Sequence, residues 1–156
     1  MPDHISPHLS YREATYSPTA IRKGIDNTPS DRELANMRNV ARECFERARA
    51  HFGTPVRITS FYRSPALNKV IGGATKSQHM TGEAMDLDCD GSPISNRQLF
   101  DYFRERGNFD QLIAEFPRED GTPEWVHVSW SATENRGQVL VASKVNGRTD
   151  YRPWTS

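Results

Sequence analysis

The strongest constraint on the fold is an amphipathic segment that runs from Ser30 to Phe52. Ser30 and Glu33 form a capping box at its start, and Gly53 followed by Pro55 prevents its continuation. Apolar residues recur along it at intervals of three and four: Leu34, Met37, Val40, Ala41, Cys44, Phe45, Ala48 and Phe52. This spacing predicts a helix over residues 30–52 with one buried face and a solvated face of arginine and glutamate.

Short alternating segments elsewhere predict a sheet. Further helices are expected near 65–70 and 95–107, and Asn146-Gly147 is a strong hairpin signal. Strands are expected at 56–60, 83–89, 124–130 and 139–143, and we favour a strand for the short apolar run 109–116. Separated helices and hairpins indicate an α+β domain with a small antiparallel sheet and flanking helices, rather than a doubly wound sheet.

The two ends of the chain carry weaker signals. Residues 1–9 lack periodicity, caps at Ser10 and Ser17 predict two short peripheral helices, and the tail from Tyr151 has no pattern. A length of 156 residues without a repeat or linker suits one domain, 1–156, with its core at about 30–145 and short helices in 1–29. The first residues show no basic segment followed by an apolar core, so synthesis in the cytoplasm without a signal peptide is expected.

Composition excludes several classes of protein. Twenty basic and twenty acidic residues give a formal net charge of zero, which argues against nucleic-acid binding. No apolar run approaches the length of a spanning helix, so no membrane insertion is expected. Two cysteines, Cys44 and Cys89, are too few for a disulfide framework. We interpret both as core or near-core residues, although Cys89 stays an alternative metal ligand.

One short stretch concentrates side chains that suit metal chemistry. His79 and Asp86 lie seven residues apart across Gly82, and His127 follows in a second short run. Glycine permits backbone angles closed to other residues, so the chain can turn there and bring His79 and Asp86 together. Two histidines and one carboxylate match the ligands of a catalytic zinc. The spacing alone leaves two interpretations open, a zinc site or three ordinary structural residues.

A hydrolytic zinc site also needs a base, for which Glu124 is the candidate. In a regular strand Glu124 and His127 would point to opposite faces, because they are three residues apart. Glu124 must therefore lie at a bend, at a bulge or in the preceding loop if both are to reach one metal. Pro123 makes an irregular backbone plausible at this point.

These runs resemble the signature of the M15 zinc peptidases, which include D-alanyl-D-alanine carboxypeptidases and phage L-alanyl-D-glutamate endopeptidases. The resembling segments are Ser77-x-His79-x-x-Gly82-x-Ala84-x-Asp86, Glu124-x-x-His127, Ser60 to Asn68, Val70 to Gly73, Asp110 to Ile113, Trp125 to Ser129, and a leader from Ser17 to Pro29 typical of phage and prophage members. Phe61 stands where relatives frequently have glycine. The resemblance spans residues 8–145 and implies the fold shared by DD-peptidases and hedgehog signalling domains.

The resemblance also implies roles for single residues. His79, Asp86 and His127 would bind Zn²⁺, Glu124 would act as general acid and base, and Arg63 would be the cation on the substrate side. Weaker candidates, for orienting the ligands or binding substrate, are Ser77, Asp88, Gln111 and Ser129.

The function implied is a zinc metallopeptidase that hydrolyses peptidoglycan stem peptides. We expect a monomeric endolysin-type enzyme of a phage or prophage that reaches the cell wall through a holin or on a virion. Three alternatives stay open: a D-Ala-D-Ala carboxypeptidase of cell-wall metabolism, a zinc peptidase for another peptide, and a non-catalytic zinc-containing binding or virion-structural module. Glu124 and Arg63 favour an enzyme, because a structural zinc needs neither.

Overall fold

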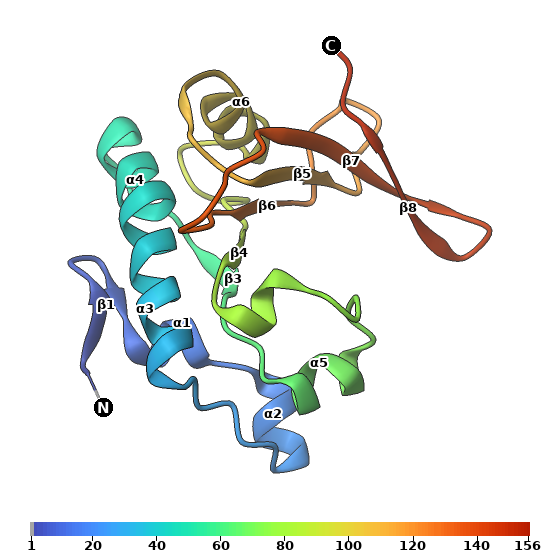
Figure 1. Ribbon diagram of the computed structural model, residues 1–156. Coiled ribbons are helices and arrows are strands. Elements are labelled where there is room, and N and C mark those ends of the chain that lie inside the picture. Colours follow the sequence, from blue (N-terminus) through green and yellow to red (C-terminus); the bar gives the residue numbers. More distant parts are fainter. Residues whose placement is uncertain (1) are drawn as a thin grey trace.

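Six strands form one mixed sheet at the centre of the molecule, as Figure 1 shows for this computed structural model, which describes residues 2–156. Their order across the sheet is β3 (Ile58–Ser60), β4 (Ala84–Leu87), β6 (Trp125–Ser129), β5 (Gln111–Glu115), β7 (Gln138–Val145) and β8 (Arg148–Pro153). Neighbours are antiparallel except for β5 and β7, which run parallel. The α+β class is confirmed. The sheet is mixed rather than purely antiparallel. After β6 the chain crosses over β5, and β7 then pairs in parallel with the free edge of β5.

The helices form where capping residues and apolar spacing predicted them. They are α1 (Tyr11–Thr15), α2 (Pro18–Lys23), α3 (Asp31–Val40), α4 (Glu46–Phe52), α5 (Pro65–Ile71) and α6 (Asn96–Arg106). A π-helical turn, η1 (Ala41–Phe45), joins α3 to α4, and a 3-10 turn, η2 (Gln78–Thr81), precedes β4. A helix able to cross a bilayer is absent from residues 2–156.

Side chains alternate in direction along each strand, so the sheet has a core face and an open face. The core face packs against α6 and the α3–η1–α4 helix, and its strand residues are Met85, Leu87, Leu112, Ala114, Val126 and Val128. Burial of each larger side chain of this kind contributes about 1.5–3 kcal/mol. The residues between them point to the opposite side of the sheet.

Both ends of the chain are more ordered than their sequences indicated. β1 (His4–Ser6) and β2 (Leu9–Ser10) form a small antiparallel pair, too short for a periodic pattern to show. At the other end, β8 pairs with β7, and Trp154 packs near Phe100 with ring centroids 5.8 Å apart.

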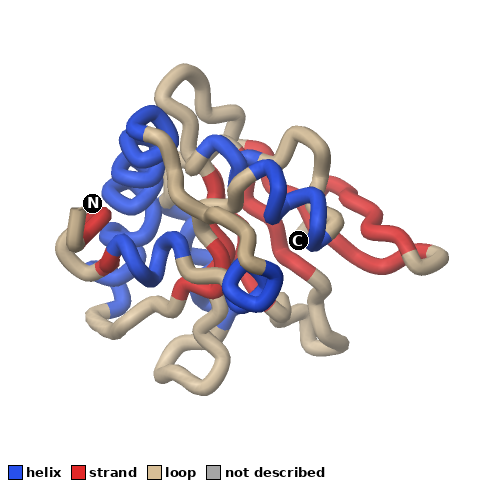
Figure 2. Tube along the Cα trace, turned by 90° about the horizontal axis from the view of Figure 1, so that it is seen from below, coloured by secondary structure: helices blue, strands red, loops and turns tan. Residues whose placement is uncertain are grey.

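The hairpin predicted at Asn146-Gly147 is present between β7 and β8. Both residues have positive φ, 51° and 75°, as a tight turn of the favoured hairpin type requires. β5 pairs with β7 only from Gln138 to Ala142, so the rest of the hairpin extends past the sheet. Figure 2 shows this projection at the right of the molecule.

Gly82 makes the turn between η2 and β4, as predicted. Its φ is +75°, and a Cβ at this position would lie 2.5 Å from the Glu33 carbonyl oxygen on α3. Gly82→Ala should therefore lower the free energy of unfolding by about 2–4 kcal/mol, measured by urea denaturation. Gly24→Ala is the matched control, because Gly24 has φ +64° but no atom within 4 Å of a Cβ. Equal losses in the two variants would show that the close approach to α3 is unimportant.

Candidate active site

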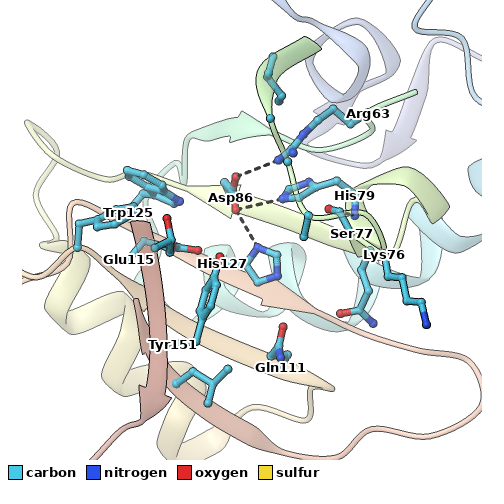
Figure 3. A pocket seen from close by; sticks show the side chains of 18 of the residues that line it. Arg63, Lys76, Ser77, His79, Asp86, Gln111, Glu115, Trp125, His127 and Tyr151 are labelled. Atoms are coloured by element: carbon cyan, nitrogen blue, oxygen red, sulfur yellow. Dashed lines mark hydrogen bonds and ion pairs between the residues drawn. The ribbon is translucent and has the colours of Figure 1, made fainter. Parts of the chain in front are cut away.

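The open face of the sheet forms one wall of a cavity of about 700 Å³ (Figure 3). The end of α5 and the chain from Gly72 to His79 form the opposite wall. The sheet residues that line it occupy alternate positions on five strands: Asp86, Gln111, Glu115, Trp125, His127, Gln138, Leu140, Lys144, Thr149 and Tyr151. Core and cavity therefore use opposite faces of the same strands.

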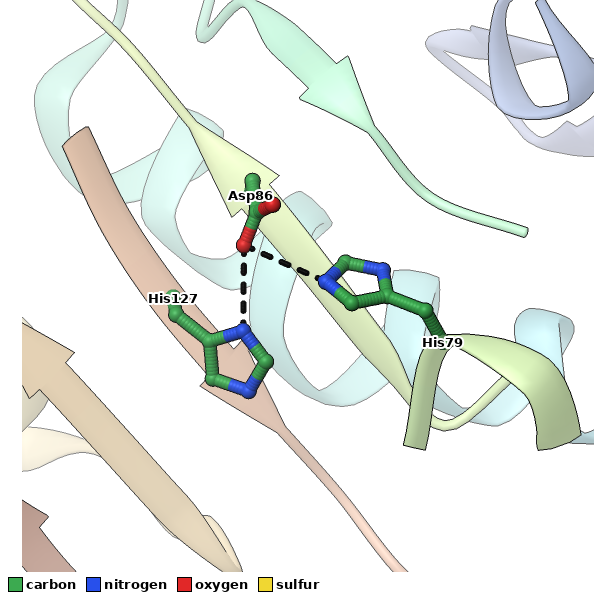
Figure 4. A group of neighbouring side chains, drawn as sticks. All are labelled: His79, Asp86 and His127. Carbon is green, nitrogen blue, oxygen red and sulfur yellow. Dashed lines mark hydrogen bonds and ion pairs between the residues drawn. The ribbon is translucent and has the colours of Figure 1, made fainter. Parts of the chain in front are cut away.

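His79, Asp86 and His127 meet in this cavity, so the structure brings the three predicted ligands together (Figure 4). Asp86 and His127 are directly opposed on β4 and β6, whereas His79 comes from η2. Asp86 Oδ1 lies 3.0 Å from His127 Nδ1 and 3.3 Å from His79 Nε2. One ligand atom from each residue lies within 4.8 Å of the others.

The protonation of His79 is set by a main-chain group. His79 Nδ1 lies 2.7 Å from the carbonyl oxygen of Phe61. Because a carbonyl only accepts, Nδ1 carries the proton and Nε2 keeps its lone pair. Nε2 is buried without a hydrogen-bond partner, a costly state that a metal ion would relieve. The donor set of two imidazoles and a carboxylate fits zinc.

The charge of Asp86 is stabilised by its two neighbours. Burial acts to raise the pKa of Asp86, but the two neighbouring imidazoles of His79 and His127 outweigh it and hold the pKa well below its ordinary value. Asp86 therefore stays ionised at neutral pH, as a metal ligand must be.

Arg63 places a cation beside the three residues. Its Nη2 lies 3.9 Å from Asp86 Oδ2, and its Nη1 donates to Asn68 Oδ1 at 2.9 Å. A Cβ on Gly73 would overlap Asn68 Oδ1 and lie 2.6 Å from Arg63 Nη1, so a larger residue at this position would displace the pair. Burial lowers the pKa of Arg63, whereas the charges of Asp86 and Glu115 raise it. Arg63 thus remains a guanidinium that lines the cavity.

The structure does not bring Glu124 to this group. Glu124 lies at a bend just before β6, is exposed, and is not among the residues that line the cavity. Its carbonyl oxygen accepts from Asn96 Nδ2 of α6, on the core side of the sheet. The pairing of β5 with β6 is regular, so no bulge turns Glu124 toward His127.

Glu115 lies in the cavity instead. It pairs with Trp125 two residues from His127, and therefore shares the open face with His127. Figure 3 shows its carboxyl group pointing into the cavity, and the residue is only 7% exposed. Burial raises the pKa of Glu115 to about 7, with smaller contributions from His127 and Asp86. The sequence held a signal for it, because Glu115 is the acidic residue of the apolar run 109–116 that has the same strand parity as Gln111.

Two of the weaker candidates line the cavity. Ser77 Oγ accepts from the His79 backbone N–H at 3.2 Å and so fixes the start of η2. Gln111 Nε2 donates to Gln138 Oε1 at 2.9 Å across β5 and β7. Their positions suit support of His79 and contact with a substrate, respectively.

The other two weaker candidates lie outside the cavity. Ser129 is buried, and its Oγ accepts from the Gln111 backbone N–H at 3.0 Å. Asp88 accepts from Arg57 at 3.0 Å beyond the end of β4. Cys89 is buried, free and outside the metal-type group found among residues 2–156.

Asp110 connects the two walls, although the sequence analysis gave it no role in the site. Arg136 Nε and Nη2 each donate to its carboxylate at 2.9 Å, as does Gln78 Nε2. These bonds, chiefly those of Arg136, lower the pKa of Asp110 to about 2. Because Gln78 precedes His79, this network ties η2 to the loop between β6 and β7.

A family model described as Peptidase M15 matches residues 7–129, which is most of the chain and includes His79, Asp86 and His127. The chain belongs to the M15 peptidase family. The resemblance noted in the sequence is confirmed. Membership of this family implies a peptide substrate, and M15 peptidases are zinc-dependent. A search of curated proteins found no match. The family match ends at Ser129, the last residue of β6, and the β7–β8 hairpin lies beyond it.

Proposed function

We propose that this M15 peptidase hydrolyses peptide bonds in the stem peptides of bacterial peptidoglycan, with zinc held by His79, Asp86 and His127. The observation that carries the proposal is the grouping of these three residues in an open cavity, with His79 Nε2 left free. Family membership supports the peptide substrate. The volume of the cavity, about 700 Å³, lies within the usual range of ligand sites.

Zinc in such a site polarises the peptide carbonyl and makes water a nucleophile at neutral pH. Glu115 takes the role that the sequence suggested for Glu124. Its carboxylate accepts the proton of the attacking water and then passes it to the leaving amine. Burial raises the pKa of Glu115 above its ordinary value, which makes its carboxylate a better acceptor for the proton of water. Arg63 holds the oxygen that becomes negative in the transition state.

The biological setting extends the proposal. We infer a lysis enzyme of a phage or prophage that reaches the wall through a holin or on a virion. This part is supported by the resemblance of Ser17 to Pro29 to the leader of such members. The carboxypeptidase alternative uses the same residues and differs in the bond that is cut, so the reaction products must distinguish them.

Mass spectrometry of purified peptidoglycan tests the proposal. The zinc-loaded protein is compared with a sample treated with EDTA. New L-Ala carboxyl ends on the glycan-linked peptide would establish an endopeptidase, and loss of terminal D-Ala from pentapeptides would establish a carboxypeptidase. A folded, zinc-bound protein that gives no metal-dependent product would overturn the proposal and favour the non-catalytic binding module.

A further inference from the structure

The β7–β8 hairpin brings a tyrosine to the level of Glu115. Glu115 pairs with Ala142 on β7, and Ala142 pairs with Tyr151 on β8. Directly paired residues share a face of the sheet, so Glu115 and Tyr151 both point into the cavity from strands about 10 Å apart. Ala142, the residue that pairs with both of them, has only a methyl side chain and is fully buried.

The side chain of Tyr151 is directed at the reactive groups. Figure 3 shows its ring rising from β8 toward Glu115 and His127, and the residue lines the cavity. The charges of Glu115, Asp86 and Arg63 all act on its hydroxyl. Half of the residue is exposed, at 51%, so the hydroxyl can reach a bound molecule.

We propose that Tyr151 is a further catalytic residue, whose hydroxyl donates a hydrogen bond to the scissile carbonyl oxygen of the peptide as that oxygen gains negative charge. The inference rests on the proposed function. It assigns a role to the hairpin, which lies outside the span of the family match.

The surroundings keep the hydroxyl in its donor form. Burial and the negative charges of Glu115 and Asp86 raise the pKa of Tyr151 above its ordinary value, so the O–H is retained throughout the neutral range. A donor fixed in advance beside a developing charge stabilises the transition state more than the ground state. The tyrosine is placed by two strand pairings, which limit its movement relative to Glu115.

Tyr151→Phe tests the role, because it removes the hydroxyl and keeps the ring. Loss of one such donor typically costs about a hundredfold in kcat, and for this half-exposed tyrosine we expect a fall of about tenfold or more. KM should change little, since the contact strengthens only in the transition state. Tyr16→Phe is the matched control, because Tyr16 is similarly exposed but lies outside the cavity.

Two readouts do not depend on turnover. Phosphinate analogues of D-alanyl-D-alanine and of L-alanyl-D-glutamate imitate the charged transition state, and the analogue that inhibits the wild type should bind Tyr151→Phe weaker by the same factor as kcat. Zinc affinity, measured by competition with a chelating dye, should be unchanged. Wild-type kcat in Tyr151→Phe, or a change confined to KM, would overturn the inference.

Failure of the proposed function would give a different result from failure of the Tyr151 inference. If the wild type neither cleaves peptidoglycan nor binds either phosphinate, the peptidase proposal is overturned, and the role of Tyr151 with it. If the wild type does both and Tyr151→Phe equals it, the hairpin role alone is wrong. Tyr151→Leu, which also removes the ring, shows whether a loss in Tyr151→Phe belongs to the hydroxyl or to packing in the cleft.

Discussion

Glu115→Gln should reduce peptidoglycan hydrolysis by about 10²- to 10⁴-fold while zinc stays bound. Glutamine keeps the shape of the buried side chain but cannot take a proton from water, and general acid–base catalysis contributes a factor of that size. Glu115 is not one of the three candidate ligands, so zinc affinity should be retained. The rate is measured by release of soluble muropeptides, and the zinc content by mass spectrometry of the native protein.

Glu124→Gln is the matched control for this experiment. Glu124 is exposed and lies outside the cavity, so the variant should keep activity within about a factor of two. The opposite pattern, with Glu124→Gln inactive and Glu115→Gln active, would show that the segment before β6 rearranges when substrate binds. The roles in the proposed function would then return to Glu124.

His79→Ala should abolish both zinc binding and hydrolysis. The substitution removes a buried ligand and leaves Asp86 and His127, which are too few for a closed coordination sphere. In the wild type, zinc at a thousand times its Kd should add about 4 kcal/mol to the free energy of unfolding. The variant should show no such response in thermal unfolding recorded with and without zinc.

His51→Ala controls for general effects of losing an imidazole. His51 stacks on Tyr102 with ring centroids 4.5 Å apart and is not one of the grouped residues. Its zinc response should equal that of the wild type. A zinc-dependent rise in Tm that survives in His79→Ala would place the metal elsewhere in the protein.

The meeting of His79 with Asp86 was predictable because its signal is local, whereas His127 lies 41 residues beyond Asp86. His79, Gly82 and Asp86 lie in one turn and one strand, and glycine at φ +75° is what that turn requires. The carboxylate that we propose as general base was harder to predict, because linear spacing placed Glu124 near His127 whereas the pairing of β5 with β6 places Glu115 there. Glu124 and His127 are three residues apart, which argued against a common face in a regular strand. That spacing could not show that a neighbouring strand would place Glu115 beside His127.

The C-terminal part of the cavity was not predictable from the same kind of signal. Asn146-Gly147 indicated a hairpin, but nothing local indicated that β7 would run parallel to β5. That pairing joins two strands that β6 separates in the sequence. It places Tyr151 at the level of Glu115, because both residues align with Ala142. The carbonyl of Phe61, which sets the proton on His79, is a main-chain group and leaves no mark in the sequence.

The two-sided use of the strands has an evolutionary consequence. Val139 and Val141 pack on the core side, while Gln138, Leu140 and Lys144 between and beside them face the cavity. Substitutions at the second set alter what the cavity accepts without removing buried volume from the first. New specificities can therefore arise on this scaffold one residue at a time, with no compensating change needed in the interior.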